Sequence, residues 1–420
     1  MTDALRQKAE TAIARVAGFP DHIRRAIFTE FSPDRIHAEL DLLIARHAKG
    51  ENMPLFGVLV SVKDLFDEAG QVTSAGSRLL ADRDVAEMDA ISVQRLRQAG
   101  ALMFGRTSMS EFAYSGVGLN PHHGTPSSAL AEGVIPGGSS SGGAVGVAMG
   151  LTDAAIGTDT GGSLRIPAAA NGIWGIKPSQ GLVDDRGVHP LAPSYDTPGP
   201  MARDLPLLHA MLSVMADDPL TAQAPERLTL AVPQGAFTDG ISPQIARLFD
   251  AEQVRIRAAG HVLEPVDMSM IGKGVGLNKI IVAVEAHRIY AQDLMQLETV
   301  GDPRVLARIR FAETLSPAQI QDAYAARVEI VAEFDQLMTG FDAALVPTLM
   351  QLPPSIAETE ADFDHLNAAM LRNTSLVNLA DGCALVMPTP GSNPSWSMTM
   401  LIGRKGADAA ILSVAEQLQA

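Results

Sequence analysis

The chain has 420 residues, with 32 basic and 48 acidic side chains and a net charge of −16. Hydrophobic residues make up 46% and charged residues 19%, which is typical of a globular protein and excludes disorder as the main state. The acidic balance argues against nucleic acid or an anionic membrane as a direct partner, because both are bound through basic surfaces.

Nothing in the sequence predicts secretion or membrane insertion. Residues 1–19 lack the basic and apolar regions of a signal peptide, and no run of 18 apolar residues occurs. The single cysteine, Cys383, excludes an internal disulfide and a paired-cysteine zinc site. We therefore expect a cytoplasmic protein.

The hydrophobic pattern predicts helices and strands in alternation. Residues 1–50 carry apolar side chains at helical spacing and are expected to form an N-terminal helical segment that packs on the core. Residues 55–62 contain alternating valines and predict a buried strand that ends at Lys63. The next predicted elements are helix 91–98, strand 101–104, loop 115–138, helix 142–150, strand 154–157 and helix 164–170.

The pattern continues after a polar, proline-bearing linker at residues 216–227. Alternation of strands with helices along the whole chain predicts an α/β fold. The predicted elements here are strand 228–232, helix 245–259, strand 261–263, helices 274–298 and 316–338, strands 343–346, 384–387 and 396–400, and a closing helix 409–418 with Asp408 as its N-cap.

Two glycine- and serine-rich stretches could supply catalytic groups. Residues 136–143 (PGGSSSGG) lead into a helix of small residues, whose first N–H groups could hold an anion; a flexible linker is the alternative. In residues 157–167 (GTDTGGSLRIP), two glycines precede Ser163 at a helix start, so backbone N–H groups could stabilise an oxyanion. The alternative is a tight turn with Ser163 as a plain N-cap. Asp159 and Arg165 predict a structural ion pair.

Lys63 is the third candidate, because lysine is rarely buried and here ends an apolar strand. Burial would lower its pKa and make it a plausible base, whereas a surface lysine at a strand end is the alternative. A serine nucleophile needs a base within hydrogen-bond reach, and lysine fills that role in some hydrolases. The three stretches together therefore indicate acyl-transfer chemistry.

These motifs, in this order, resemble the amidase signature family. The resemblance covers residues 54–203 and continues more loosely to the C-terminal helix. It implies one large α/β/α domain over residues 51–420, with a mixed sheet of roughly ten strands between helices, and hydrolysis of a linear carboxamide C–N bond without a cofactor. The matching strings are 57–64 (GVLVSVKD), 136–143, 157–167, 175–181 (GIKPSQG) and 196–203 (DTPGPMAR).

The family uses a Ser–Ser–Lys triad whose bridging serine lies 24 residues before the nucleophile. On this chain the spacing implies Ser163 as nucleophile, Ser139 as bridging serine after a cis Gly138–Ser139 peptide bond, and Lys63 as base. By the same resemblance, the oxyanion hole consists of the backbone N–H groups of Thr160, Gly161, Gly162 and Ser163. Ser140, Asp159 and Arg165 would form a supporting network.

Three alternatives stay open beside this reading. Residues 138–142 also fit G-x-S-x-G, the nucleophile elbow of α/β-hydrolases, which would make Ser140 the nucleophile and require a later Asp and His. Pro136 disfavours the strand that an elbow requires before it. The chain could instead be a glutaminase-type A subunit of a tRNA-dependent amidotransferase, or a catalytically silent relative that only binds.

Neither a metal nor a nucleotide cofactor is predicted, since no H-E-x-x-H or P-loop motif occurs. His122 and His123 lie in a proline-bearing loop, where exposure or local hydrogen bonding is a more common outcome than a role in a pocket. Two segments depart from the family, residues 107–109 and 392–400, so the sequence does not identify the substrate. The expected partner is a small-molecule amide, with a homodimer left open.

Overall fold

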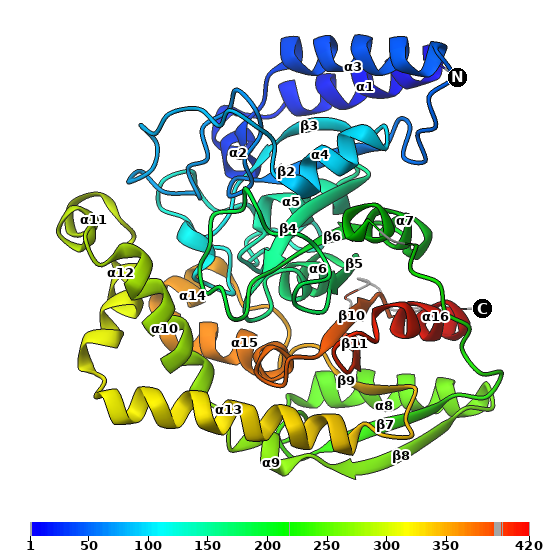
Figure 1. Cartoon of the computed structure of the whole chain (residues 1–420), viewed down its shortest axis with the longest axis vertical. Helices are drawn as coiled ribbons and strands as arrows, with labels where there is room; N and C mark the ends of the chain where they lie inside the picture. Colours follow the sequence, from blue (N-terminus) through cyan, green and yellow to red (C-terminus); the bar gives the residue numbers. More distant parts are fainter. Residues whose placement is uncertain (1, 218, 390–395, 397, 420) are drawn as a thin grey trace.

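The computed structural model describes all residues except 1, 218, 390–395, 397 and 420 (Figure 1). Its centre is one mixed sheet of eleven strands in the order β1-β3-β2-β4-β6-β5-β10-β11-β9-β7-β8, with helices on both faces. This confirms the predicted α/β class. The strands are β1 (Phe28–Glu30), β2 (Leu59–Lys63), β3 (Leu102–Thr107), β4 (Ala154–Asp159), β5 (Trp174–Lys177), β6 (Thr197–Ala202), β7 (Thr229–Gln234), β8 (Val262–Asp267), β9 (Ala343–Pro347), β10 (Cys383–Met387) and β11 (Thr399–Gly403).

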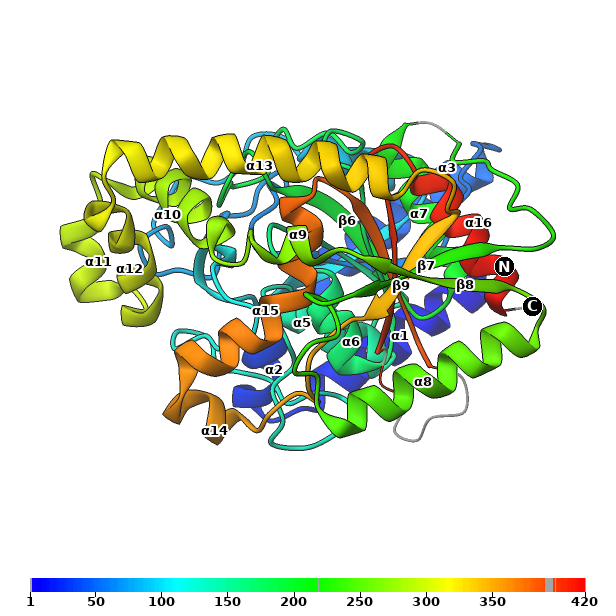
Figure 2. The same cartoon turned by 90° about the horizontal axis from the view of Figure 1, so that it is seen from below.

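Helices cover the sheet and form a projection at one side, where α10, α11 and α12 lie together in both views (Figures 1 and 2). The helices are α1 (Thr2–Ala17), α2 (Asp21–Ile27), α3 (Pro33–Ala48), α4 (Ile91–Gln98), α5 (Ser141–Ala148), α6 (Arg165–Asn171), α7 (Leu205–Ala216), α8 (Pro243–Ala258), α9 (Ser269–Gly272), α10 (Leu277–Tyr290), α11 (Leu294–Val300), α12 (Pro303–Arg310), α13 (Pro317–Leu337), α14 (Ile356–Ala361), α15 (Phe363–Leu379) and α16 (Asp408–Gln419), with short 3-10 turns η1 (Glu111–Ala113) and η2 (Phe311–Thr314).

The two faces of the sheet carry separate hydrophobic clusters. Along β10, Leu385 belongs to one cluster and Val386 to the other, as expected when successive side chains point to opposite faces. Helices α4, α7 and α16 pack on the first face, and α5 and α6 pack on the second. Because Val60 and Val62 of β2 face the first cluster, Lys63 points to the face that α5 and α6 cover.

Several predicted elements differ from the structure. Residues 28–30, within the segment predicted as helical, form the edge strand β1, and the strand predicted from residue 55 begins only at Leu59. Asp408 is not an N-cap: α16 begins at this residue, and its carboxylate instead accepts the N–H of Ser179 at 2.8 Å.

Of the predicted strand 396–400, residue 397 lies outside the described residues, as do 392–395 of the divergent segment. Among the described helices, none is long and apolar enough to cross a membrane.

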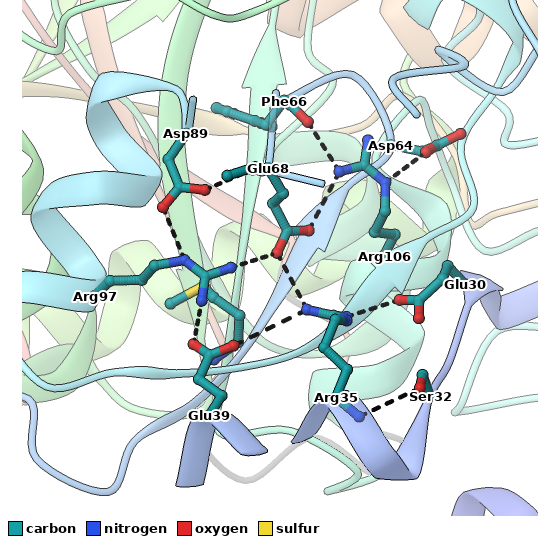
Figure 3. Close-up of polar contacts among 12 residues, drawn as sticks. Glu30, Ser32, Arg35, Glu39, Asp64, Phe66, Glu68, Asp89, Arg97 and Arg106 are labelled. Atoms are coloured by element: carbon teal, nitrogen blue, oxygen red, sulfur yellow. Dashed lines mark hydrogen bonds and ion pairs between the residues drawn. The ribbon is translucent and has the colours of Figure 1, made fainter. Parts of the chain in front are cut away.

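A buried charge network joins the N-terminal helices to the sheet (Figure 3). Its centre is Glu68, whose side chain is fully buried and accepts from Arg97 at 2.9 Å and Arg106 at 3.2 Å. Arg35, on α3, reaches the same carboxylate at 3.4 Å and Glu30 at 2.7 Å. Helix α3 is thereby tied to α4 and β3 through the carboxylate of Glu68, and to β1 through that of Glu30.

Glu68→Gln is expected to destabilise the protein by about 3–5 kcal/mol, because it leaves three arginines without their shared buried anion. The free energy of urea-induced unfolding measures this loss. Asp41→Asn is the control on the same segment, since Asp41 forms an exposed ion pair with Arg6 that should contribute only about 0–1 kcal/mol. Equal effects of the two substitutions would show that the network does not hold the segment in place.

Candidate active site

Lys63 lies at the end of β2, beside the parallel strand β4. Its side chain is 0% exposed, and Nζ donates to the hydroxyls of Ser139 at 2.8 Å and Thr158 at 3.0 Å. It forms no ion pair with any residue that the structure describes. A lysine in these surroundings meets only neutral hydroxyls at its amine.

Burial lowers the pKa of Lys63 to about 7, although the carboxylates of Asp159 and Asp196 act in the opposite direction. The adjacent Asp64 does not bind the lysine, because its carboxylate accepts from Arg106 Nε at 2.9 Å and from the Ser74 hydroxyl. The amine can therefore be neutral near pH 7 and accept a proton from a neighbouring hydroxyl.

The two serine stretches meet in front of this lysine. The Gly138–Ser139 peptide bond is cis, and the carbonyl oxygen of Ser139 accepts the N–H of Ser110 at 3.1 Å. The N–H of Ser140 donates to the carbonyl oxygen of Ser163 at 3.4 Å, which joins the residues before α5 to those before α6. No hydrogen bond links the hydroxyls of Ser139 and Ser163 among the contacts of the described residues.

Ser163 faces a cavity of about 490 Å³, together with Thr160 and Gly161. Lys63 and Ser139 do not line this cavity, so Ser163 is the member of the predicted triad that a bound molecule would meet first. The three residues thus run from the protein interior to the cavity wall, with the lysine at the buried end.

The four predicted oxyanion-hole N–H groups, in residues 160–163, donate to no other group in the described part of the chain. The turn is held from outside: Thr160 Oγ1 donates to Asp196 at 2.5 Å, and Thr374 Oγ1 donates to the carbonyl of Gly161 at 2.7 Å. Gly162 has φ +142°, and a Cβ there would lie 2.2 Å from Thr374 Oγ1, so only glycine fits. The backbone of this turn is therefore fixed, while its N–H groups have no acceptor within the described part of the chain.

Asp159 and Arg165 form a fully buried ion pair directly behind this turn, with Arg165 Nη2 and Nε at 2.9 and 3.0 Å from the carboxylate. Asp159 also accepts the N–H of Leu164 at 3.2 Å and an amide N–H of Asn378 at 3.0 Å. Burial alone would raise the pKa of Asp159, but Arg165, Lys177 and Asn378 together outweigh it and hold that pKa at about 2. The pair orders the start of α6 and does not line the cavity.

Ser140 lies apart from the cavity. Its hydroxyl is buried without a hydrogen-bond partner among the described residues and packs on Gly157, where a Cβ would come within 2.5 Å of it. Neither His122 nor His123 lines the cavity; His122 Nε2 instead lies 2.9 Å from the buried carboxylate of Glu111. Burial lowers the pKa of His123.

The sequence analysis missed two residues of the site, Thr158 and Asp196. Thr158 supplies the second hydroxyl that accepts a hydrogen bond from Lys63. It could be found only from the parallel pairing of β2 with β4, and a single sequence does not show that pairing. Asp196 accepts from Thr160 and from the N–H groups of Leu191 and Ala192 at 2.8 and 3.0 Å, and burial raises its pKa to about 6. Asp196 belongs to the matching string at residues 196–203, but no local pattern indicates which groups its carboxylate binds.

Comparison with known proteins agrees with this fold. The family model named Amidase matches residues 10–412, and the chain belongs to the amidase family. Amidase 1 of Oryza sativa subsp. japonica is 31% identical over 88% of this chain and 91% of its own length. The 2-amino-5-chloromuconic acid deaminase of Comamonas testosteroni is 32% identical over 87% of this chain and 82% of its own length.

A crystal structure of an amidase superposes with a TM-score of 0.89 at 27% identity, covering 100% of this chain and 98% of that one. The resemblance drawn from the five motifs is thereby confirmed, as is the single α/β domain. Family and relatives together support hydrolysis of an amide C–N bond as the reaction of this chain.

Proposed function

We propose that the chain hydrolyses a small linear carboxamide through an acyl-enzyme on Ser163, with Ser139 and Lys63 as the proton relay. The observation that carries the proposal is the fully buried Lys63, whose amine contacts hydroxyls and no carboxylate. Another buried lysine, Lys177, donates to two backbone carbonyls, which carry no proton to exchange, whereas both partners of Lys63 are hydroxyls. Because burial lowers the pKa of Lys63 to about 7, a substantial share of the molecules carry it in the neutral, proton-accepting form near that pH.

The reaction begins when neutral Lys63 accepts the proton of the Ser139 hydroxyl, and Ser139 takes that of Ser163. Ser163 Oγ then attacks the amide carbon, and the carbonyl oxygen gains the negative charge. Rotation of the Ser163 side chain brings its hydroxyl onto Ser139, since catalytic hydrogen bonds are often long in unliganded enzymes and tighten on binding. The relay returns the proton to the leaving ammonia or amine.

The free N–H groups of residues 160–163 receive the oxyanion. Each donor of this kind typically contributes about 2.7–4 kcal/mol to the transition state. Water then attacks the acyl carbon by the same relay and releases the acid. The cavity volume of about 490 Å³ fits a small molecule rather than a protein chain.

Labelling with a fluorophosphonate, followed by peptide mass spectrometry, tests the assignment. We expect one adduct, on Ser163, because this hydroxyl lines the cavity next to the free N–H groups. An adduct on Ser140 with Ser163 unmodified would contradict the proposal and favour the nucleophile-elbow alternative.

A panel of primary amides, anilides, ureas and glutamine, offered to the purified chain alone, tests the reaction itself. Turnover of one of these amides without a second protein supports a self-sufficient amidase. Turnover of glutamine only when a copurifying partner is added would instead favour the glutaminase-type A subunit.

A further inference from the structure

The cavity beside Ser163 is positively charged, although the chain as a whole carries −16. Its wall contains three cationic side chains, Lys279, Arg308 and Arg372, and among the described lining residues one carboxylate, Asp364. Solubility does not require a positive cavity wall in a protein whose net charge is negative. The charge of this wall raises the question of which of these cations is free to bind a ligand.

Two of the cations are already engaged or solvated. Arg372 donates from Nη1 to the carbonyl of Asp239 and from Nε to Asn373 at 3.1 Å. Lys279 is exposed to solvent and lies over the ring of Phe311, 4.4 Å from its centroid. Lys279 is therefore solvated, and Arg372 is held by two partners, although its buried Nη2 has no hydrogen-bond partner among the described residues.

Arg308 differs from both. Its Nη1 donates to the carbonyl of Tyr114 at 2.6 Å, and the guanidinium carbon lies 4.8 Å from the centroid of the Tyr114 ring. It forms no ion pair with any described residue; the exposed Asp364 acts on it only through its charge. A guanidinium has five N–H donors, so most of the donors of Arg308 lack a partner within the described chain.

The neighbouring arginines of α12 show the contrast. Arg304 pairs with Asp302 at 2.7 Å, and Arg310 pairs with Glu298. Within one short helix, the arginine without a carboxylate partner is therefore the one that lines the cavity. Burial lowers the pKa of its guanidinium, although the charge of Asp364 acts in the opposite direction.

The base of α12 is fixed so that Arg308 keeps its place. The N–H of Asp302, the N-cap of this helix, donates to the buried carboxylate of Glu111 at 2.6 Å. Glu111 also accepts from Ser77 at 2.7 Å and opens the turn that ends at Tyr114, the partner of Arg308. One buried carboxylate thus positions both the helix and the residue that orients the guanidinium.

We propose that Arg308 binds the carboxylate of an anionic substrate, so that the preferred substrate is an amide that also bears a carboxylate group. This rests on the proposed function, and it makes Arg308 a specificity-determining residue. A planar guanidinium binds a carboxylate through two parallel hydrogen bonds, which fixes the orientation of the substrate as well as its affinity. Hydrolysis of such a molecule consumes water and yields ammonia and a dicarboxylate.

Ligand-induced shifts of the melting temperature test the proposal without depending on turnover. The probes are oxamate, malonamate, succinamate and glutaramate, each beside its neutral diamide. We expect at least one of these monoamides to stabilise the wild type more than its diamide does. In Arg308→Met the apparent affinity for that monoamide should fall about 10-fold or more, the usual scale for a hydrogen-bonded charge.

Lys279→Met is the matched control, because it removes one positive charge from the same cavity wall and should weaken binding less than about threefold. Arg308→Lys keeps the charge but loses the planar fork, and we expect an intermediate affinity. The melting temperature of unliganded Arg308→Met shows whether that variant folds. If it does not fold, Arg308→Lys takes its place in the test.

Three results would overturn the proposal: no monoamide outperforming its diamide on the wild type, binding retained in Arg308→Met, or equal losses in the Arg308 and Lys279 variants. Labelling of Ser163 by a neutral fluorophosphonate distinguishes failure of the proposed role of Arg308 from failure of the proposed function. Normal labelling with no preference for carboxylates refutes the role of Arg308 alone. Carboxylate binding without any labelling of Ser163 refutes the acyl-enzyme alone.

Discussion

Ser163→Ala is expected to lower kcat/KM for an amide substrate by on the order of 10⁴- to 10⁶-fold, the scale on which serine hydrolases lose activity without their nucleophile. The substitution removes a hydroxyl that lines the cavity and belongs to the turn of free N–H groups at residues 160–163. Residual activity would come from the oxyanion hole and substrate binding alone. Steady-state kinetics of the purified variant measure the loss, and its melting temperature shows that it is folded.

Ser140→Ala is the matched control, a second serine-to-alanine change in the same site. Its hydroxyl has no hydrogen-bond partner among the described residues and does not line the cavity, so we expect a loss of no more than about 10-fold. If Ser140→Ala were as damaging as Ser163→Ala, the hydroxyl of Ser140 would have to act in the reaction, and the roles of the two serines would need to be reassigned.

The sequence was informative where the chemistry depends on local pattern. Lys63 was recognised because it ends an apolar strand, and Ser163 because two glycines precede it at a helix start. Such features need only a few neighbouring residues to be visible. Spacing within the family then related the two serine stretches to each other, which no local rule could do.

Strand β6 shows why part of the fold was missed. Its sequence, TPGPMA, contains two prolines and a glycine, which disfavour a central strand. The strand nevertheless lies between β4 and β5, but β5 pairs only with its last two residues, Met201 and Ala202. The proline-bearing part is therefore paired on one side only, where a missing N–H is tolerated.

The long-range contacts around the cavity were equally hidden. Arg308 meets the carbonyl of Tyr114 across 194 residues of sequence, and Thr374 meets Gly161 across 213. Contacts of this range depend on the folded topology, and neither residue stands in a recognisable motif. The proposed catalytic groups could be named from the sequence, whereas Arg308, which we propose selects the substrate, required the structure.

For wild-type enzyme, kcat/KM is expected to rise with pH, bend near pH 7 and stay level above it, because only neutral Lys63 accepts a proton. At pH 7 a lysine with its ordinary pKa near 10.4 would be neutral in roughly one molecule in 2,500. Burial lowers the pKa of Lys63 to about 7, so that about half the molecules are active at that pH. Below the bend, each unit of pH should cost about tenfold in rate, since the protonated amine cannot act as a base.

A second buried lysine provides the control for this assignment. Burial lowers the pKa of Lys177 to about 8, and its amine donates to the carbonyls of Pro178 and Gly382 at 3.0 and 2.8 Å. Lys177→Arg should leave the bend near pH 7 in place, because this side chain does not reach the triad. A bend that disappears in this variant would assign the titration to Lys177 instead.

Lys63→Arg separates a base from a fixed positive charge. Arginine keeps its proton at any working pH, so the variant should lose nearly as much kcat/KM as Lys63→Ala, about 10²- to 10⁴-fold for the loss of general-base catalysis. Both variants should also lose the bend near pH 7, since the titrating group is gone. Retention of most activity by Lys63→Arg would mean that the lysine acts through its charge, and the relay through Ser139 would then have no proton acceptor.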